Sequence, residues 1–485
     1  MSKILLKDFV NECNVRFGTS GVRAKVEELT DKVVFVYTLG FIQFLKTKFP
    51  DYDLNSIMIA GDLRPSTPHI KQIVRLAIES QGLVCKDAGF VPTPALTNYA
   101  LKNNLPSIMI TGSHIPADRN GLKFIRPDGE LMKEDEEIFL SEEVEYDEKI
   151  ETKINSNESD SNELQSQVID EFKLRYTSFF DNDYLKGKKI GVYGHSAVGR
   201  DVLVDLLTEF GAEVTKLGFS NTFIPVDTEA IRKEDEELAK KWTSEFGLDA
   251  IVTTDGDSDR PMIADEKGYW FKGDVLGIFV AIDLGLEALA TPISSNTGIL
   301  GTEILAIMFT KIGSPYVIKA MRKLSKEYIC VGAYEANGGF LLGSEIKGKN
   351  GSLSILETRD AYLPLLSILK FSIDKNLKMS ELYSLIPSRV TYSSKIDNFP
   401  LEKSKLILEE LKKDKSKLKD DISSVVDSII KKVNLLDGVR LIFENEDVVH
   451  IRPSGNAPEL RIYTESVSLS AAKEINMQVS KLLEK

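Results

Sequence analysis

Residues 107–124 read SIMITGSHIPADRNGLKF, and this stretch decides how the whole chain is interpreted. The apolar run at 107–112 predicts a buried strand. The run stops at a Gly-Ser-His turn, so the hydroxyl of Ser113 and the imidazole of His114 come where the strand ends. A polar loop that carries Lys123 follows. Ligands of open α/β sheets bind beyond the carboxyl ends of strands, so this turn is a candidate site of chemistry.

Helix and strand patterns alternate along the chain before this stretch. Residues 31–48 and 66–80 have helical patterns, whereas 56–62 and 84–90 have the short apolar runs of strands. Spacing of this kind predicts βαβ units and a sheet that contains parallel strands.

The alternation restarts near residue 188 and again near 273, so the sequence predicts three α/β units of one type. An acidic, Ser/Asn-rich stretch at 156–166 predicts a linker or an inserted surface loop. From about residue 386 the pattern changes, and an amphipathic stretch at 401–433 precedes short strands joined by tight turns. This order predicts a small antiparallel α+β domain.

The composition narrows the class of protein. The chain has 485 residues and a formal net charge of −13, which disfavours nucleic acid and acidic membrane surfaces as partners. No apolar run approaches the roughly 18 residues of a membrane span, and acids come too early for a secretory signal. Three scattered cysteines, with no CxxC spacing, indicate reduced thiols. We therefore expect a cytoplasmic protein that binds any anionic substrate through local clusters of cations.

The acidic loop, DGDSDR at residues 255–260, follows an apolar run. Asp255, Asp257 and Asp259 alternate, and carboxylate oxygens are the hard ligands that Mg²⁺ prefers. Three acids this close repel one another unless a cation lies between them, which favours a metal site over a solvated turn. A calcium loop is the alternative, because Glu266 stands at its twelfth position. An arginine at the turn glycine and a preceding strand argue against it.

Three further segments carry donors that suit a phosphorylated sugar. The arginine segment, RPSGNAPELR at residues 452–461, places two guanidiniums around a glycine-bearing loop, which fits a phosphate clamp. The glycine-rich loop, YEANGG at 334–339, has side chains that can bracket vicinal hydroxyls, and RFGTSGVR at 16–23 is a weaker signal. The candidate binding residues are Thr19, Arg23, Glu335, Asn337, Arg452, Ser454, Gly455, Asn456 and Arg461.

Two serines are candidate nucleophiles. Ser196 lies in GHSAVG, which nearly matches a hydrolase elbow, but a valine replaces its second glycine, so Ser196 and His195 are predicted to be structural. A serine hydrolase that uses Ser196 is kept as an alternative. Ser113 lacks a well-placed base, because sequence neighbours such as His114 point apart.

A phosphorylated Ser113 would instead be a phosphoryl donor. That role requires a divalent cation on the phosphoryl oxygens and positive groups near the acceptor. The three aspartates supply the first requirement, and Lys123 and Arg260 supply the second.

Five motifs, taken together and in order, resemble those of the α-D-phosphohexomutase superfamily, the phosphomannomutase/phosphoglucomutase proteins. They are FGTSGVR, TGSH with NGLKF, DGDSDR, YEANGG and RPSGNAPELRIY, and they extend over essentially the whole chain. The resemblance implies three related α/β domains with mixed, largely parallel sheets, and a C-terminal α+β domain like TATA-binding-protein folds, around a central cleft. The implied domain boundaries are 1–155, 156–270, 271–385 and 386–485.

The resemblance also implies a role for each candidate residue. The implied catalytic residues are Ser113, His114, Lys123 and Arg260, and the implied Mg²⁺ ligands are Ser113, Asp255, Asp257 and Asp259. Glu335 and Asn337 would recognise sugar O3 and O4, and the arginine segment would hold the phosphate that does not react. Asn337 and Asn456 replace a Ser and a Thr that are usual in the family, so the sugar preference is open.

The implied function is a phosphomannomutase that interconverts mannose 6-phosphate and mannose 1-phosphate. The reaction would pass through a phosphoserine enzyme and a 1,6-bisphosphate intermediate, with hexose 1,6-bisphosphate as primer. The alternatives are a phosphoglucomutase or dual-specificity phosphohexomutase, a phosphoglucosamine mutase, and a non-catalytic sugar-phosphate-binding regulator. We expect a monomer or homodimer that binds neither nucleic acid nor membrane.

Overall fold

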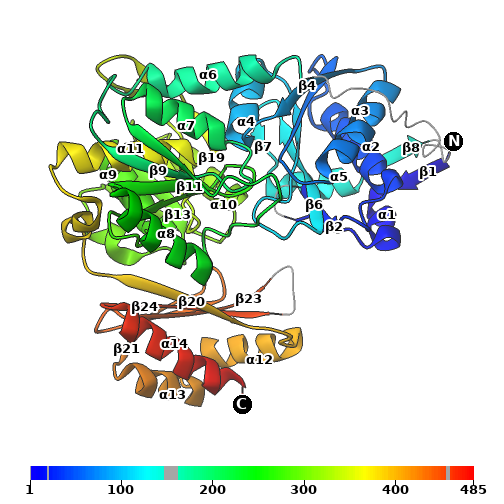
Figure 1. Ribbon diagram of the computed structural model, residues 1–485. Coiled ribbons are helices and arrows are strands. Elements are labelled where there is room, and N and C mark those ends of the chain that lie inside the picture. Colours follow the sequence, from blue (N-terminus) through cyan, green and yellow to red (C-terminus); the bar gives the residue numbers. More distant parts are fainter. Residues whose placement is uncertain (1, 19–20, 147–161, 455–458, 485) are drawn as a thin grey trace.

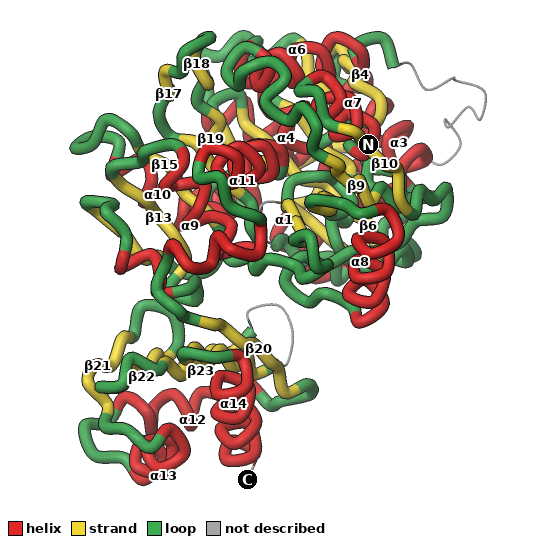
Figure 2. The backbone as a smooth tube through the Cα atoms, turned by 60° about the vertical axis from the view of Figure 1, so that its left-hand side comes forward, coloured by secondary structure: helices red, strands yellow, loops and turns green. Residues whose placement is uncertain are grey.

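The computed structural model describes residues 2–18, 21–146, 162–454 and 459–484 (Figure 1). It contains three mixed sheets followed by an antiparallel C-terminal sheet, as the sequence predicted. Figure 2 shows the C-terminal part set apart from the rest and reached through β20 (Val390–Ile396). Among the described residues, no helix is both long and apolar enough to cross a membrane.

The first sheet has the order β2-β6-β5-β3-β4, and β7 pairs with β6. The strands β3, β4 and β5 are parallel, whereas β6 runs antiparallel to both β5 and β2. The helices around it include α2 and α3, and β1 and β8 form a separate two-stranded antiparallel sheet. The bounds are β1 (Ser2–Leu5), α1 (Leu6–Cys13), β2 (Gly21–Lys25), α2 (Asp31–Lys48), β3 (Ser56–Gly61), α3 (Thr67–Ser80), β4 (Val84–Phe90), α4 (Thr93–Lys102), β5 (Ser107–Ile110), β6 (Arg119–Arg126), β7 (Gly129–Glu130), α5 (Lys133–Leu140) and β8 (Glu143–Tyr146).

The second and third sheets likewise combine neighbouring parallel strands with antiparallel strands at one end of the sheet. The second has the order β10-β9-β11-β12, and the third has the order β14-β13-β15-β16-β19. The bounds are α6 (Gln165–Thr177), β9 (Lys189–Tyr193), α7 (Arg200–Glu209), β10 (Glu213–Leu217), α8 (Lys233–Phe246), β11 (Ala250–Thr254), β12 (Pro261–Ala264), α9 (Gly273–Asp283), β13 (Ala288–Pro292), η2 (Thr297–Gly301), β14 (Ala306–Thr310), α10 (Ser314–Leu324), β15 (Val331–Tyr334), β16 (Phe340–Leu342), β17 (Ile346–Lys347), β18 (Ser352–Leu353), β19 (Leu356–Asp360), α11 (Tyr362–Asp374) and η3 (Met379–Leu385).

Alternating side chains of the first sheet enter two different cores. Ile57 and Ile59 of β3 pack into the core beneath α2 and α3. Met58 and Ala60, which point to the opposite face, join a core that continues through the second and third sheets as far as Leu382. Successive side chains of a strand alternate between faces, so a strand that is buried on both faces, such as β3, can join two cores. The first three sheets therefore share one continuous core.

The C-terminal sheet has its own core and the order β20-β24-β23-β22-β21, with every pairing antiparallel. Figure 1 shows α12, α13 and α14 along one face of this sheet. The bounds are α12 (Leu401–Lys412), α13 (Lys417–Val426), β21 (Ile430–Asn434), β22 (Val439–Phe443), β23 (Val448–Pro453), β24 (Leu460–Ser466) and α14 (Leu469–Glu484).

The amphipathic stretch at 401–433 is divided more finely than the sequence suggested. It forms two helices and most of a strand, because Ser416 caps a new helix by accepting a hydrogen bond from the Lys419 amide at 3.3 Å. Asp427 then ends that helix in the left-handed conformation, at φ 53°. Residues 156–161 of the predicted linker lie outside the described residues, and its last two residues, 165 and 166, instead begin α6.

Candidate active site

The serine loop, residues 111–116, follows β5 and holds Ser113 in a strained, buried position. Ser113 has φ 56°, a left-handed conformation that costs a non-glycine residue roughly 1–3 kcal/mol and marks many functional sites. Its amide donates to Thr111 Oγ1 at 2.7 Å, and its Oγ donates to Asp255 Oδ2 at 2.6 Å. The hydroxyl of the first sheet thus contacts a carboxylate of the second, although 142 positions separate the two residues.

Arg64, which follows β3, holds the serine loop in place. Its guanidinium donates to the carbonyl oxygens of Ser113 at 2.8 Å and Ile115 at 2.6 Å. It also donates to the carbonyl oxygens of Pro116, the last residue of the loop, and of Arg119, the first residue of β6. Asp62 balances the charge at 3.1 Å, and both side chains are buried. Gly112 is required here, because an added Cβ would lie 2.6 Å from the Arg64 guanidinium carbon. The loop conformation is therefore imposed by buried charge.

The acidic loop follows β11 and packs directly on the serine loop. Ligand atoms of Asp255, Asp257 and Asp259 lie within 4.8 Å of one another, and all three residues are buried. Asp257 also accepts a hydrogen bond from the Thr93 hydroxyl at 2.7 Å. A Cβ on Gly256 would lie 2.7 Å from the Ser113 carbonyl oxygen, so only glycine permits this approach.

The three carboxylates fit a divalent cation. Burial, together with the charges of Asp257 and Asp259, raises the pKa of Asp255 well above its usual range, which shows how strongly the acids repel. The Oδ1 atoms of Asp257 and Asp259 are buried and have no hydrogen-bond partner among the described residues. Hard oxygen ligands in this number are those that Mg²⁺ prefers, and the cation would neutralise the repulsion.

Two buried cations lie close to the acids. Lys123 Nζ, on β6, lies 3.0 Å from Glu130 Oε1 and 3.7 Å from Asp259 Oδ2. Arg260 Nε lies 3.7 Å from Asp259 Oδ1. Burial opposes the charge on Asp259, but nearby cations, including Lys123 and Arg260, hold its pKa below the usual range. An anionic substrate would therefore meet positive groups directly beside the carboxylates.

The expectation that Ser113 and His114 point apart was wrong: His114 Nδ1 lies 3.3 Å from Ser113 Oγ, because the left-handed backbone of Ser113 turns the two side chains toward each other. Desolvation, followed by the charges of Arg260 and Arg23, lowers the pKa of His114 to about 2. The imidazole is therefore neutral at physiological pH. Arg23, on β2, is exposed to solvent.

The glycine-rich loop follows β15 and presents Glu335 to the same region. Glu335 Oε1 accepts hydrogen bonds from the Ser314 hydroxyl and from Arg359, whose Nη1 lies 3.2 Å away. Asn337 Oδ1 accepts from the Gly339 amide at 3.0 Å, and the Asn337 carbonyl accepts from the Thr228 hydroxyl at 2.9 Å. One oxygen of each predicted sugar-binding side chain thus already stabilises the loop.

The arginine segment runs from the end of β23 into β24. Arg452 Nε pairs with Asp437 Oδ2 at 2.9 Å, and the Ser454 amide donates to the Glu459 carbonyl at 2.8 Å. Arg461 Nη2 lies 3.4 Å from Glu459 Oε2, while its Nε has no hydrogen-bond partner within the described ranges. Gly455 and Asn456 lie outside the described residues, as does Thr19.

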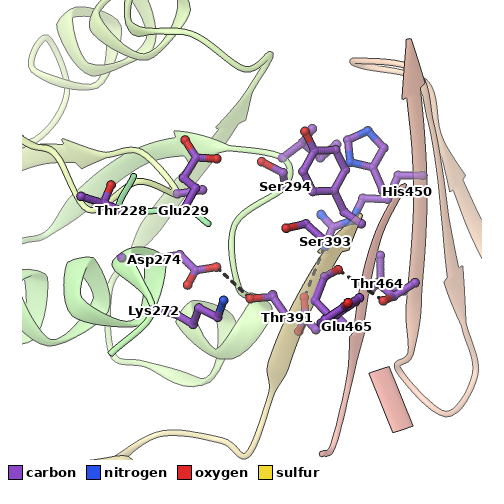
Figure 3. Close-up of a pocket in the computed structure, with 17 residues that line it drawn as sticks. Thr228, Glu229, Lys272, Asp274, Ser294, Thr391, Ser393, His450, Thr464 and Glu465 are labelled. Carbon is purple, nitrogen blue, oxygen red and sulfur yellow. Dashed lines mark hydrogen bonds and ion pairs between the residues drawn. The ribbon is translucent and has the colours of Figure 1, made fainter. Parts of the chain in front are cut away.

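A pocket connects the C-terminal sheet with the second and third sheets (Figure 3). Figure 3 shows Glu229 and Lys272 on one side, facing Ser393 and His450 on the other. Desolvation raises the pKa of Glu229, and the nearby charges include Arg260 and Arg461, which oppose the rise, and Glu335, which adds to it. Charges from the acidic loop, the glycine-rich loop and the arginine segment thus act on one carboxylate.

The structure disfavours two alternative sites. Ser196 Oγ accepts from the Ile224 amide at 2.7 Å and donates to the Ile224 carbonyl at 3.3 Å, so it is held as a structural hydroxyl. His195 Nε2 contacts the Thr254 carbonyl at 2.7 Å instead of a serine. Glu266 bonds to Ser380 rather than joining the aspartates, so the calcium-loop pattern does not close.

Four residues that the sequence analysis did not single out shape this site: Arg64, Thr93, Glu130 and Arg359. Arg64 follows a strand in GDLRPS, and Arg359 lies near the end of a strand in ETRDAY. Because ligands of α/β sheets bind beyond the carboxyl ends of strands, a search of those positions could have found both arginines. Thr93 and Glu130 meet their partners only once the chain has folded, and no local sequence pattern indicates that they belong to the site.

Fold and site together define a phosphoryl-transfer class: a serine hydroxyl on a carboxylate cluster, cations beside it, and a separate sheet that carries further arginines. Family models described as phosphoglucomutase/phosphomannomutase match residues 14–154 (alpha/beta/alpha domain I), 170–268 (alpha/beta/alpha domain II) and 398–482 (C-terminal domain). The chain therefore belongs to the phosphoglucomutase/phosphomannomutase family, within the α-D-phosphohexomutase superfamily, as the motifs predicted.

Individual relatives agree over nearly the full length. A phosphomannomutase of Salmonella muenchen is 40% identical, covering 96% of this chain and 95% of its own. A phosphomannomutase of Sinorhizobium fredii (strain NBRC 101917 / NGR234) is 38% identical, covering 96% and 97%. The crystal structure of a phosphoglucomutase/phosphomannomutase family protein from Burkholderia thailandensis has a TM-score of 0.70 at 16% identity and covers 96% of both chains. That structure supports the fold.

Proposed function

We propose that the protein is a phosphomannomutase that interconverts mannose 6-phosphate and mannose 1-phosphate. The observation that carries the proposal is the 2.6 Å contact between Ser113 Oγ and Asp255 Oδ2, which places a transferable hydroxyl on the carboxylate cluster. Two phosphomannomutases that resemble the chain over nearly all of its length support a mutase of the isomerase class and mannose phosphates as its substrates.

The proposed reaction has two mirrored halves. In the first, the bond between phosphorus and Ser113 Oγ breaks, and a bond forms from phosphorus to the free hydroxyl of the hexose phosphate. The proton of that hydroxyl passes to a base, for which His114 and Lys123 are the candidates. The resulting 1,6-bisphosphate turns over, and its other phosphoryl group returns to Ser113. Hexose 1,6-bisphosphate serves as the primer that phosphorylates the enzyme.

The residues of the chain have distinct roles in this scheme. Asp255, Asp257 and Asp259 would hold Mg²⁺ together with Ser113, and the cation would stabilise charge on the transferred phosphoryl group. Lys123 and Arg260 place positive charge beside it.

The residues that recognise the substrate must bind the sugar in both of its orientations. Glu335 and Asn337 bind the O3 and O4 hydroxyls, which the two orientations share. Arg23, Arg452, Ser454 and Arg461 hold the phosphate that does not react, with Thr19, Gly455 and Asn456 as further proposed contacts. Excluding water protects the phosphoserine while the intermediate turns.

The test compares mannose 1-phosphate, glucose 1-phosphate and glucosamine 1-phosphate in coupled assays with Mg²⁺ and a bisphosphate primer. We expect the highest kcat/KM with mannose 1-phosphate and one phosphate on the Ser113 peptide by mass spectrometry. A higher kcat/KM with glucose 1-phosphate would indicate a phosphoglucomutase, and with the amino sugar a phosphoglucosamine mutase. Sugar-phosphate binding without turnover or phosphoserine would indicate a regulator.

A further inference from the structure

Arg359 links two loops that have separate tasks in the proposed function. It stands near the end of β19, and its guanidinium is buried with a side-chain exposure of 7%. Nε and Nη2 donate to Asp259 Oδ2 at 3.0 and 2.7 Å. Nη1 donates to Ser314 Oγ at 2.7 Å and to Glu335 Oε1 at 3.2 Å. A single planar cation thus holds an acid of the acidic loop and the acid of the glycine-rich loop.

The contacts of Arg359 leave one oxygen of Asp259 without a hydrogen bond among the described residues. Both donors on that side go to Oδ2, while Oδ1 is buried and has no hydrogen-bond partner in the described part of the chain. The carboxylate is therefore fixed by one oxygen and offers the other to a cation. A guanidinium suits this role because its donors form a rigid fork, whereas the ammonium of a lysine is a single point charge.

The absence of a side chain at Gly339 leaves room for the side chain of Arg359. A Cβ on Gly339 would lie 2.5 Å from Arg359 Cδ and 2.7 Å from its Cγ. Gly339 has no left-handed φ, so its backbone conformation suits alanine. The contact excludes a side chain at 339 because the arginine, held by four hydrogen bonds, cannot move aside freely.

We propose that Arg359 is a positioning residue that couples cation binding at Asp259 to sugar binding at Glu335. The proposal rests on the function proposed above. It adds that Arg359 fixes the position of the metal-binding Asp259 relative to the sugar-binding Glu335. Displacing the guanidinium then weakens both kinds of binding at once, although Arg359 itself is neither a proposed ligand of the metal nor of the sugar.

The test measures binding without turnover. Mn²⁺ alone is titrated by electron paramagnetic resonance, and mannose 1-phosphate is titrated by calorimetry, using dephosphorylated full-length protein. In Arg359→Met and Gly339→Ala we expect Mn²⁺ affinity to fall by about 10–100-fold, the usual effect of losing a partner of a metal ligand, and sugar-phosphate affinity to fall as well. Arg359→Lys should recover only part of either loss, because an ammonium cannot reproduce the fork.

Two matched variants control for general damage. Arg175→Met removes another buried arginine, which bonds to Ser354, and Gly343→Ala adds a methyl group that would lie 2.8 Å from Met321 Cγ. Both should keep the parent affinities. Parent-like affinities in folded Arg359→Met and Gly339→Ala would overturn the proposal, as would a loss of only one of the two affinities. If the parent binds Mn²⁺ but no hexose phosphate, the proposed function fails, and the Mn²⁺ titrations alone still decide whether Arg359 holds Asp259.

Discussion

The acidic loop and the arginine segment both bring charge to the proposed cleft, but they are constructed in opposite ways. The three aspartates are buried, and their partners come from segments as distant as Thr93, Ser113 and Arg359. In the arginine segment, by contrast, the Arg461 side chain is 41% exposed. The segment belongs to a sheet with its own core, outside the core that runs through the first three sheets.

The difference follows from what each region has to do. A phosphoryl-transfer centre gains from groups that are fixed before the reaction, which the continuous core provides. A region that holds the distant phosphate must release and rebind the substrate as the intermediate turns. A sheet that has its own core, and that the chain enters through the short segment 386–389, can move for that purpose. Substitutions in the fixed centre should therefore impair turnover, whereas substitutions in the mobile phosphate-binding region should impair substrate affinity.

Removing the hydroxyl of Ser113 should have the largest effect. Ser113→Ala should reduce kcat by about 10⁴-fold or more, as loss of a covalent group does in other enzymes, while the affinity for mannose 1-phosphate stays near the parent value. Steady-state kinetics and calorimetry measure the two quantities. Ser196→Ala is the control and should keep its turnover. Normal turnover by Ser113→Ala would refute the phosphoserine assignment.

The acidic loop should be sensitive to a single neutral replacement. Asp257→Asn should raise the Mg²⁺ concentration for half-maximal activity by roughly 10²-fold, because one anionic ligand is lost. The matched control is Asp265→Asn, since Asp265 is also buried but its carboxylate accepts hydrogen bonds from the Lys267 and Tyr269 amides of a turn. An unchanged Mg²⁺ requirement in Asp257→Asn would contradict a metal site at the trio.

A substitution in the arginine segment should weaken substrate binding rather than slow the phosphoryl transfer. Arg461→Met should raise KM for mannose 1-phosphate by about 10–100-fold, the equivalent of one charged hydrogen bond, with a much smaller change in kcat. Lys395→Met is the control, because Lys395 faces Arg461 across β20 and β24 and is already paired with Asp397 and Glu459. An equal rise in KM for both variants would indicate that Arg461 contributes only general positive charge and makes no specific contact with the phosphate.

The sequence predicted most of the first three sheets because their strands and helices have strong local periods. The helix at 31–48 and the strand at 84–90 have the expected bounds in the structure. The prediction was weakest where a local choice depends on one polar residue, as at Ser416, which begins a second helix within an unbroken amphipathic pattern.

The loops of the candidate site were found because each follows an apolar strand with a distinctive cluster of polar residues. Their supports were not found, because a buried cation such as Arg64 or Arg359 has meaning only through partners that are distant in the sequence. The arginines of a surface and those of a buried network look alike in a linear chain. The assigned roles of the site residues and the four domain boundaries stay predictions.

The junction between the two regions should give the smallest change in activity. Glu465 of β24 accepts hydrogen bonds from Arg389 Nε at 3.0 Å and from the Thr297 amide at 3.2 Å, and thereby joins the C-terminal sheet to η2. Glu465→Gln removes the charge that these donors and Arg440, 3.8 Å away, surround. We expect the free energy of unfolding of the C-terminal part to fall by ~1–3 kcal/mol, with kcat changed only a few-fold. Thermal unfolding and limited proteolysis measure the first effect, with Glu474→Gln on the exposed face of α14 as the control. If Glu465→Gln instead abolished turnover without loosening the C-terminal sheet, the junction would belong to the fixed centre, and the division between the two regions would be wrong.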